Sequence, residues 1–228
     1  MEEVRGRELA SKIDLTLLRA DASSREVEEL CRRGAELGFA AVCVNPYWAE
    51  LASRLLKGSR VKVCCVVGFP LGATLGEVKA FEAARAVEQG ASEVDVAVNL
   101  GALKTGSYGV VEEELGLVVE AVRSRGGEVV KAIIEVPLLT LSEVEAACRA
   151  ALRAGVDYVK TGTGVLTRGV TVEDVKLLRR FVEGRAEIKA SGGVRSYRQA
   201  LELLKAGASR IGSSAGYEIV LESLRQSY

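Results

Sequence analysis

The strongest constraint on the fold is a local pattern that occurs four times, in which a helical stretch ends in glycine and an apolar run typical of a strand follows directly. The four glycines are Gly38, Gly90, Gly155 and Gly207. Glycine commonly ends a helix because it adopts the left-handed backbone conformation without a steric penalty. The pattern therefore predicts that helices and strands alternate along the chain.

Between these four strands lie further β-type runs at residues 13–16, 61–67, 129–135 and 185–189. Helical stretches separate them, and their apolar residues recur at helical spacing, as in Val27, Leu30, Cys31 and Leu37 or in Leu141, Val144, Cys148 and Leu152. No linker divides the chain. Eight strands alternating with helices over this length predict an α/β fold, a single (β/α)8 TIM barrel over residues 1–228 with a short extra N-terminal helix.

An open, doubly wound sheet is the alternative architecture. Its support is the run Gly162-Thr163-Gly164, which resembles part of a dinucleotide-binding fingerprint. That fingerprint requires a third small residue where Thr167 stands, and it follows an early strand rather than a late one. The barrel is therefore the favoured prediction.

Composition removes several kinds of chemistry. The chain has no histidine, which excludes nucleophiles activated by histidine and metal sites built on it. The five cysteines form no Cys-x-x-Cys pair, so we expect reduced core residues and a cytoplasmic location. The formal net charge is zero and no long apolar stretch occurs. We therefore expect neither nucleic acid nor a membrane as a partner.

Two lysines end apolar runs directly before or near glycine-rich turns. Lys160 follows residues 156–159 and enters the turn 161–164, and Lys189 follows residues 186–188. A lysine at a strand end ordinarily extends into solvent. Two such amines favour imine chemistry instead. A neighbouring like charge and desolvation depress the pKa of an amine and leave it neutral enough to attack an aldehyde.

Strand register predicts which side chains meet. The fifth residue after each of the four glycines is Cys43, Asp95, Lys160 and Gly212. Equal offsets give equal facing, and side chains from alternate strands share one layer inside a barrel. We therefore expect Asp95 and Lys160 to meet near the C-terminal mouth, with Lys189 and Asp14 in a neighbouring layer. Position alone leaves open whether Asp95 is a base or only an ion-pair partner.

Two glycine-rich turns follow the last two strands and precede helices, Ser191-Gly192-Gly193-Val194-Arg195 and Gly212-Ser213-Ser214-Ala215-Gly216. Either turn alone is explained by tight chain reversal. Both lie where barrels of this kind commonly bind phosphate through backbone amides. A phosphorylated substrate is therefore expected.

The chain resembles deoxyribose-phosphate aldolase, a family of class I (Schiff-base) aldolases, over nearly its whole length. The segments that carry the resemblance are residues 13–18, 42–46, 68–72, 93–95, 158–164, 188–195 and 210–214. Together these motifs are specific. The resemblance implies reversible cleavage of 2-deoxy-D-ribose 5-phosphate to D-glyceraldehyde 3-phosphate and acetaldehyde, without a metal or organic cofactor, in a homo-oligomer, either a dimer or a tetramer.

The resemblance also implies roles for individual residues. Lys160 would form the imine, and Asp95 and Lys189 would transfer protons, partly through water. The expected substrate-binding residues are Asp14, Thr16, Thr163, Gly192, Gly193, Gly212, Ser213 and Ser214. Cys43 is expected to pack and to be a point of covalent inactivation by aldehydes. Tyr228 corresponds to a tail tyrosine implicated in protonating the enamine in some members, although a frayed terminus is the ordinary interpretation.

The sequence departs from the family pattern at three places. Leu15 stands where many relatives carry histidine, and Ala215 follows Ser214 where many carry a second serine. Val165 replaces a basic residue that some relatives have, and Arg168 is a candidate substitute. We expect weaker phosphate binding and unchanged chemistry.

Three other functions stay open at this point. They are another Schiff-base aldolase or transaldolase that acts on a different sugar phosphate, a phosphosugar isomerase, and a phosphate-binding module without catalysis. The isomerase is disfavoured because it needs no amine on the sixth strand. The binding module is disfavoured because two partly buried amines give it no benefit.

Overall fold

The computed structural model describes residues 4–225, and its strands form a closed parallel barrel in which each strand pairs with the next and β8 pairs with β1. The strands are β1 (Ile13–Leu17), β2 (Ala41–Val44), β3 (Lys62–Val67), β4 (Glu93–Ala97), β5 (Val129–Ile133), β6 (Tyr158–Lys160), β7 (Glu187–Ser191) and β8 (Arg210–Ser213). All eight predicted strands are present, and the barrel prediction is confirmed.

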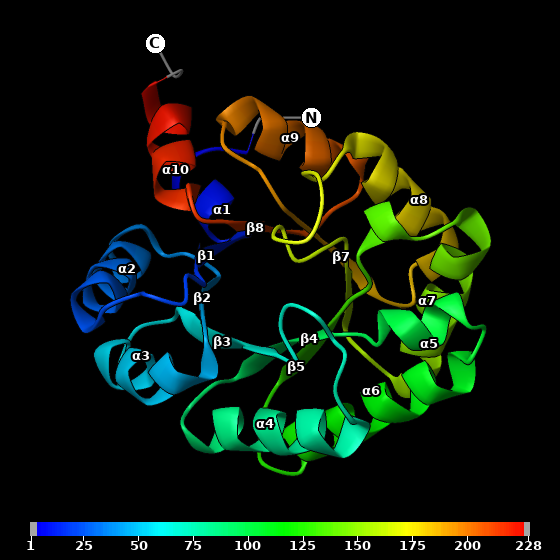
Figure 1. Cartoon of the computed structure of the whole chain (residues 1–228). Helices are drawn as coiled ribbons and strands as arrows, with labels where there is room; N and C mark the ends of the chain where they lie inside the picture. Colours follow the sequence, from blue (N-terminus) through cyan, green and yellow to red (C-terminus); the bar gives the residue numbers. More distant parts are fainter. Residues whose placement is uncertain (1–3, 226–228) are drawn as a thin grey trace.

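The helices surround the strands as a ring (Figure 1). They are α1 (Gly6–Ala10), α2 (Ser24–Leu37), α3 (Ala49–Leu55), α4 (Gly76–Glu88), α5 (Leu100–Lys104), α6 (Tyr108–Arg123), α7 (Leu141–Ala154), α8 (Val172–Val182), α9 (Tyr197–Ala206) and α10 (Gly216–Arg225), with 3-10 turns η1 (Pro46–Trp48) and η2 (Val136–Leu138). Helix α1 precedes β1, as predicted, and the backbone N–H of Gly6 donates to Ser223 of α10.

Local sequence explains where the helices begin and end. Helices α2, α7 and α8 each start with a capping box, in which a serine or threonine hydroxyl and an acidic side chain three residues later satisfy each other's backbone N–H groups. Gly38, Gly155 and Gly207 end their helices in the left-handed conformation, as predicted. Gly90 lies one residue beyond the C-cap of α4, with φ of 100°.

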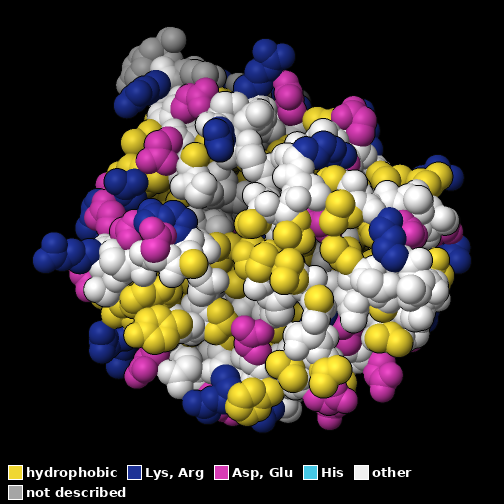
Figure 2. All heavy atoms as spheres, in the orientation of Figure 1, with side chains coloured by type: hydrophobic (Ala, Val, Ile, Leu, Met, Phe, Trp, Pro, Cys, Tyr) yellow, Lys and Arg dark blue, Asp and Glu magenta, His cyan; other side chains and the backbone are white. Residues whose placement is uncertain are grey.

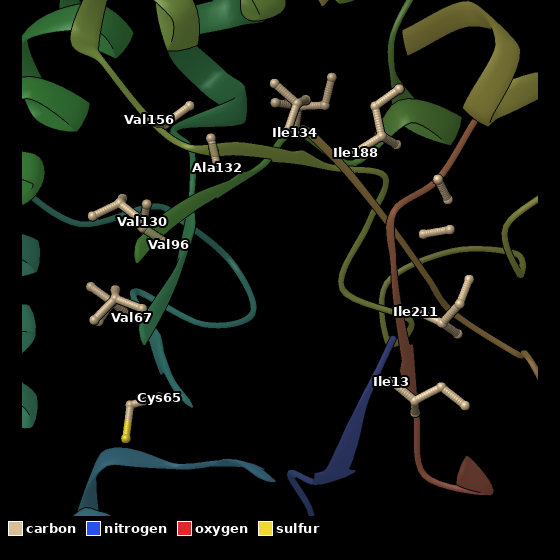
Figure 3. Close-up of a cluster of buried hydrophobic side chains, with 14 of the residues drawn as sticks. Ile13, Cys65, Val67, Val96, Val130, Ala132, Ile134, Val156, Ile188 and Ile211 are labelled. Atoms are coloured by element: carbon tan, nitrogen blue, oxygen red, sulfur yellow. The ribbon is translucent and has the colours of Figure 1, made fainter. Parts of the chain in front are cut away.

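The strands bury apolar side chains between the barrel and the helices. Residues that alternate along each strand, such as Ile13, Val67, Val96 and Ile211, belong to one continuous core (Figure 3). The opposite set points into the barrel. On β2 and β3 this inner set is a small apolar cluster of Ala41, Cys43, Cys64 and Val66. The other strands contribute charged residues to the interior, and these form the candidate site.

Within residues 4–225, none of the helices combines the length and the apolar character that crossing a membrane requires. In the orientation of Figure 1, hydrophobic side chains gather over the centre of the visible face, and charged side chains lie mostly around its edge (Figure 2). The loops after β3 and β6 cross over the middle of the barrel in the same view.

Candidate active site

Asp95 on β4 is the centre of a buried network of charges inside the barrel. Its Oδ2 accepts hydrogen bonds from Lys160 Nζ at 2.7 Å and from Lys189 Nζ at 2.6 Å. All three side chains are at least 96% buried. The predicted meeting of Asp95 and Lys160 is therefore confirmed, and Lys189 reaches across from its own layer to the same oxygen.

The other oxygen of Asp95 is held by two groups that the sequence interpretation missed. Lys131 Nζ on β5 donates to Asp95 Oδ1 at 2.9 Å, and the thiol of Cys64 on β3 donates to it at 3.1 Å. Lys131 is paired with Asp95 across the two strands. The sequence signal for Lys131 was a lysine in the middle of the apolar run 129–133. The structure shows that this lysine is fully buried, and a buried lysine needs a buried partner.

Below this level, Asp14 bridges the network to Arg210. Lys189 donates to Asp14 Oδ2, and Arg210 Nη1 donates to Asp14 Oδ1 at 2.6 Å. Glu93 Oε2 forms an ion pair with Lys131 Nζ at 2.6 Å and accepts a hydrogen bond from Arg210 Nη1 at 3.3 Å. Glu93 and Arg210 are further members that the sequence analysis did not identify, because they lie at the N-terminal ends of β4 and β8, away from the glycine-rich turns.

The opposite charges in this network stabilise the ionised forms of Asp95, Asp14 and Lys189. Burial opposes ionisation of Asp95, but Lys131, Lys160 and Lys189 outweigh it and hold the pKa of Asp95 well below its usual value. Asp14 is similar, since burial is outweighed by Lys189, Lys131 and Arg210, and its pKa is lowered. Burial likewise opposes the charge of Lys189, but Asp14 and Asp95 raise the pKa of this amine.

The pKa of Lys189 is raised. From the sequence we expected the like charge of Lys189, together with desolvation, to depress the pKa of one amine. Two carboxylates contact Lys189 directly, and their attraction exceeds the repulsion from Lys131. Lys189 is therefore held as a cation in this structure.

Among the described residues, the network contains four cations and three carboxylates, namely Lys131, Lys160, Lys189 and Arg210 with Asp14, Glu93 and Asp95. Its charge is balanced only when one cation loses a proton. Lys131, Lys189 and Arg210 each pair with two or more carboxylates, whereas Lys160 pairs with Asp95 alone. Lys160 is therefore the cation of this network with the fewest carboxylate partners.

A cavity of about 1260 Å³ opens above the network. Lys160 is the only lysine among its described lining residues, and Asp95, Lys189 and Asp14 lie beneath it, out of the lining. The predicted residues that line the cavity are Thr16, Thr163, Gly192, Gly193, Gly212, Ser213 and Ser214. Asp14, expected to face the substrate, is instead held below by Lys189 and Arg210.

One wall of the cavity presents backbone donors. Within residues 4–225, the N–H groups of Gly193, Val194 and Ser214 have no hydrogen-bond acceptor in the protein. Arg195 lies on the same wall, and no carboxylate of the described residues pairs with its guanidinium. Unpaired amides and a cation suit an anion. The predicted phosphate site thus has a physical basis in the structure.

Glycine is required where the loops and strands of this wall approach closely. A Cβ on Gly164 would lie 3.0 Å from the Cα of Gly192, so the loops after β6 and β7 touch backbone to backbone. A Cβ on Gly212 would lie 2.8 Å from Ser191 Cβ and 3.2 Å from Lys189 Cε. These contacts explain why glycine-rich turns occur here.

The remaining sequence predictions have mixed outcomes. Arg168 donates to both carboxylate oxygens of Asp174, so it is not directed toward the cavity in place of the basic residue missing at Val165. Cys43 is buried and does not line the cavity, and the pKa of its thiol is lowered, chiefly by hydrogen bonding with Cys64. Tyr228 lies outside the described residues.

Carboxylates and thiols come close enough to suggest metal ligands in two groups, Cys43, Cys64 and Asp95, and Asp14, Cys64 and Glu93. Every carboxylate in these groups already pairs with lysine or arginine. A metal ion there would sit against those cations. The arrangement therefore supports an ion-pair network rather than a metal centre.

Comparisons with known proteins agree with this arrangement. A family model described as DeoC/LacD family aldolase matches residues 9–222. The chain is 50% identical over 212 residues to a deoxyribose-phosphate aldolase of Geobacillus sp. (strain WCH70), covering 93% of this chain and 94% of the relative. It is 51% identical over 213 residues to one of Carboxydothermus hydrogenoformans, covering 93% of each.

Solved structures give the same result. One described as "QR15, an Aldolase" has a TM-score of 0.91 at 42% identity and covers 99% of this chain and 98% of its own. Another, described as the unique tetrameric structure of deoxyribose phosphate aldolase from Aeropyrum pernix, has a TM-score of 0.89 at 37% identity, with 97% and 93% covered.

Proposed function

Because the chain belongs to the DeoC/LacD family of aldolases, we propose that Lys160 is the Schiff-base amine in the reversible cleavage of 2-deoxy-D-ribose 5-phosphate to D-glyceraldehyde 3-phosphate and acetaldehyde. The resemblance inferred from sequence is confirmed at the level of the family. The single observation that supports the assignment of Lys160 is its place as the only lysine among the described residues that line the cavity.

The reaction begins when the uncharged amine of Lys160 attacks the aldehyde carbon of the open-chain sugar. The hydroxyl of that adduct takes a proton from the Asp95–Lys189 relay and leaves as water, which gives an iminium ion. Its positive charge replaces the ammonium charge of Lys160, so Asp95 keeps its ion pair at 2.7 Å. A base takes the proton of the C3 hydroxyl, the C2–C3 bond breaks, and its electron pair moves toward the iminium nitrogen to form an enamine.

The enamine then takes a proton at C2 and water releases acetaldehyde from Lys160. Asp95 and Lys189 are the proposed proton carriers, partly through water. They share one short contact directly below Lys160, Asp95 Oδ2 to Lys189 Nζ at 2.6 Å. Since Lys131 and Cys64 occupy the other oxygen of Asp95, the carboxylate is fixed in orientation.

The phosphate of the substrate binds at the wall formed by Gly192, Gly193 and Ser214, where backbone N–H groups face the cavity. Arg195 supplies the positive charge that relatives draw from the position of Val165. Thr16 and Thr163 line the space between this wall and Lys160 and contact the sugar hydroxyls.

The test is borohydride reduction of the enzyme with acetaldehyde, followed by peptide mass mapping. We expect a reduced two-carbon adduct on the peptide that contains Lys160 and none in Lys160→Met. Lys79→Met is the matched control, because Lys79 is a buried lysine on α4 that does not line the cavity, and it should be labelled like wild type. An adduct that persists in Lys160→Met would contradict the assignment.

A second candidate is a Schiff-base aldolase that acts on a different sugar phosphate. A cavity of about 1260 Å³ accommodates more than one five-carbon substrate pose. Product analysis with deoxyribose 5-phosphate, its 2-hydroxyl counterpart and a ketose phosphate separates the two. Turnover of the deoxy sugar alone supports the first candidate.

We also propose a homo-oligomer, a dimer or tetramer, in the cytoplasm. The five buried cysteines, none in a disulfide, are consistent with a reducing compartment. Tyr47 is 84% exposed, whereas the neighbouring Trp48 is partly buried. Leu75, Val78 and Phe81 form an exposed apolar stripe on α4. Light scattering should show an oligomer, and Phe81→Asp should reduce it to monomers.

A further inference from the structure

Glu135 is a buried carboxylate that the mechanism above does not use. It is 2% exposed and follows β5, where it precedes η2. Its backbone lies in the left-handed region with φ of 54°, one of two non-glycine residues with positive φ among those described. A non-glycine residue in this region is strained, so the surrounding structure must hold it there.

No lysine or arginine of the described residues forms an ion pair with Glu135. Its carboxylate is instead held by neutral donors from the loop that follows Lys160. Thr163 N donates to Oε2 at 2.8 Å, and Thr167 Oγ1 donates to Oε1 at 2.7 Å. A buried carboxylate without a cation is costly unless such hydrogen bonds are well formed.

The segment that Glu135 contacts begins at Gly162, two residues after the Schiff-base lysine. A Cβ on Gly162 would lie 2.9 Å from Glu135 Oε1, so the carboxylate rests directly on the backbone there. Thr163 Oγ1 in turn accepts from the N–H groups of Val165 and Leu166 at 3.2 and 3.3 Å. Glu135 thereby fixes residues 162–166, of which Thr163, Gly164 and Val165 line the cavity.

The same segment is joined to the anion-binding turn. Ser191 Oγ donates to the carbonyl of Gly162 at 2.7 Å, and Val170 N donates to the carbonyl of Gly192 at 2.9 Å. A Cβ added to Gly192 would lie 3.3 Å from the Cα of Gly164, so the two backbones pack closely here. A displacement of residues 162–170 would therefore move the phosphate wall relative to Lys160.

We propose that Glu135 is a positioning residue that sets the distance between the Schiff-base amine and the phosphate wall, and so determines the preference for phosphorylated over unphosphorylated substrates. This inference rests on the proposed function. It assigns Glu135 a geometric role, because its carboxylate contacts the loop and lies out of the cavity lining.

The experiment compares kcat and KM for 2-deoxy-D-ribose 5-phosphate and for unphosphorylated 2-deoxy-D-ribose. In Glu135→Ala we expect KM for the phosphorylated sugar to rise at least tenfold while kcat/KM for the unphosphorylated sugar changes less than threefold. Glu135→Gln should retain most of the preference. Its carbonyl accepts from Thr163 N, and the Thr167 hydroxyl can accept from its amide N–H.

Two controls separate positioning from a general loss of structure. Thr167→Val removes one of the two contacts and should give a smaller loss of preference in the same direction. Glu183→Ala alters the other left-handed glutamate, which is exposed at the end of α8, and should behave like wild type. If Glu135→Ala fails to fold, Thr167→Val decides the question.

Labelling by acetaldehyde and borohydride keeps the two proposals distinguishable, because this two-carbon probe needs Lys160 and no phosphate wall. Glu135→Ala should still be labelled at Lys160. Equal losses for both sugars, or an unchanged preference, would overturn the role of Glu135. Absence of labelling in wild type would overturn the proposed function instead.

Discussion

Two buried groups of charges in this molecule respond to burial in opposite ways. In the barrel interior, neighbours lower the pKa of Asp95 and raise that of Lys189, against the effect of burial. Between α4 and α6, Lys79 and Glu114 form an isolated pair at 2.7 Å. There burial dominates over the single partner, lowering the pKa of Lys79 and raising that of Glu114.

The difference teaches what several partners add. The attraction within one buried ion pair barely offsets the free energy needed to remove its two charges from water. In a network where most charged groups contact two or three groups of opposite charge, the attraction is large enough to keep them ionised. The pair on the helices is complete with one charge of each sign. The barrel network has a cation in excess, and that excess is located where a neutral amine is needed.

The largest effect that tests this contrast is on activity. Lys160→Met removes the excess cation and the nucleophile together, while Asp95 keeps Lys131 and Lys189 as partners. We expect kcat/KM to fall by at least about 10⁴-fold with a change in unfolding free energy below about 1 kcal/mol. Steady-state kinetics and urea denaturation measure the two. A variant with more than a few per cent activity would contradict the role of Lys160.

Lys79→Met should produce the reverse outcome. It leaves Glu114 buried at 3% exposure without its counterion, and we expect a loss of roughly 3–5 kcal/mol in unfolding free energy. The folded enzyme should keep kcat within about threefold. The double variant Lys79→Met/Glu114→Gln should recover most of the stability. If the double variant is no more stable than the single one, the isolated pair is not the source of the cost.

Strand periodicity predicted the centre of the site but not its surroundings. The two-residue period placed Asp95 and Lys160 on one interior layer because the capping glycines set a common register. Lys131 and Arg210 were not predicted because neither ends its strand directly before a glycine-rich turn, although both point inward by the same period. The ion pair between Lys79 and Glu114 could not be predicted from the sequence, because it depends on how α4 and α6 are rotated against each other.

The third test measures how the stability of the fold changes as the pH is lowered. The pKa values of Asp14 and Asp95 are lower in the folded chain than the value of 3.8 expected when unfolded. The folded state therefore binds fewer protons, and the stability these groups contribute is complete above that value and is lost as the pH falls below it. Down to pH 3, which is less than one unit below 3.8, the loss should be about 1 kcal/mol per carboxylate.

Denaturation between pH 7 and pH 3 measures this dependence. Asp14→Asn should be less stable than wild type at pH 7 and should lose less stability on acidification. Glu114 carries the opposite sign, because its raised pKa makes the folded state bind a proton more readily. Equal slopes for Asp14→Asn and wild type would show that Asp14 contributes nothing to the acid response.

A smaller effect tests the cation excess itself. Arg210→Met removes one positive charge that is three ion pairs away from Asp95, through Asp14 and Lys189. The network then has as many carboxylates as cations and should release a proton less readily, so the acid limb of the kcat/KM profile should move up by about one pH unit. Glu93→Gln should move it down.

The double variant Glu93→Gln/Arg210→Met restores the excess and should return the acid limb to its wild-type position. This cancellation distinguishes electrostatics from a loss of packing, because packing defects add rather than cancel. Shifts in the same direction for both single variants would refute the charge-counting argument.

The smallest expected effect concerns the cysteine thiols. Their pKa values, like those of the charged groups, depend on whether they lie beside the barrel network or apart from it. Burial raises the pKa of Cys31 to about 11 and of Cys148 to about 12, outside the barrel. Cys43 lies beside the network. Hydrogen bonding with Cys64 lowers the pKa of its thiol, Lys189 lowers it further, and burial opposes both effects.

Because the thiolate is the reactive form, Cys43 should be the thiol that bound aldehydes modify. Cys43→Ala should slow inactivation by concentrated acetaldehyde several-fold, measured as residual activity against time, while Cys148→Ala should inactivate like wild type. If both variants lose activity at the wild-type rate, the lowered pKa of Cys43 has no chemical consequence, and proximity to the charges alone does not make a buried thiol reactive.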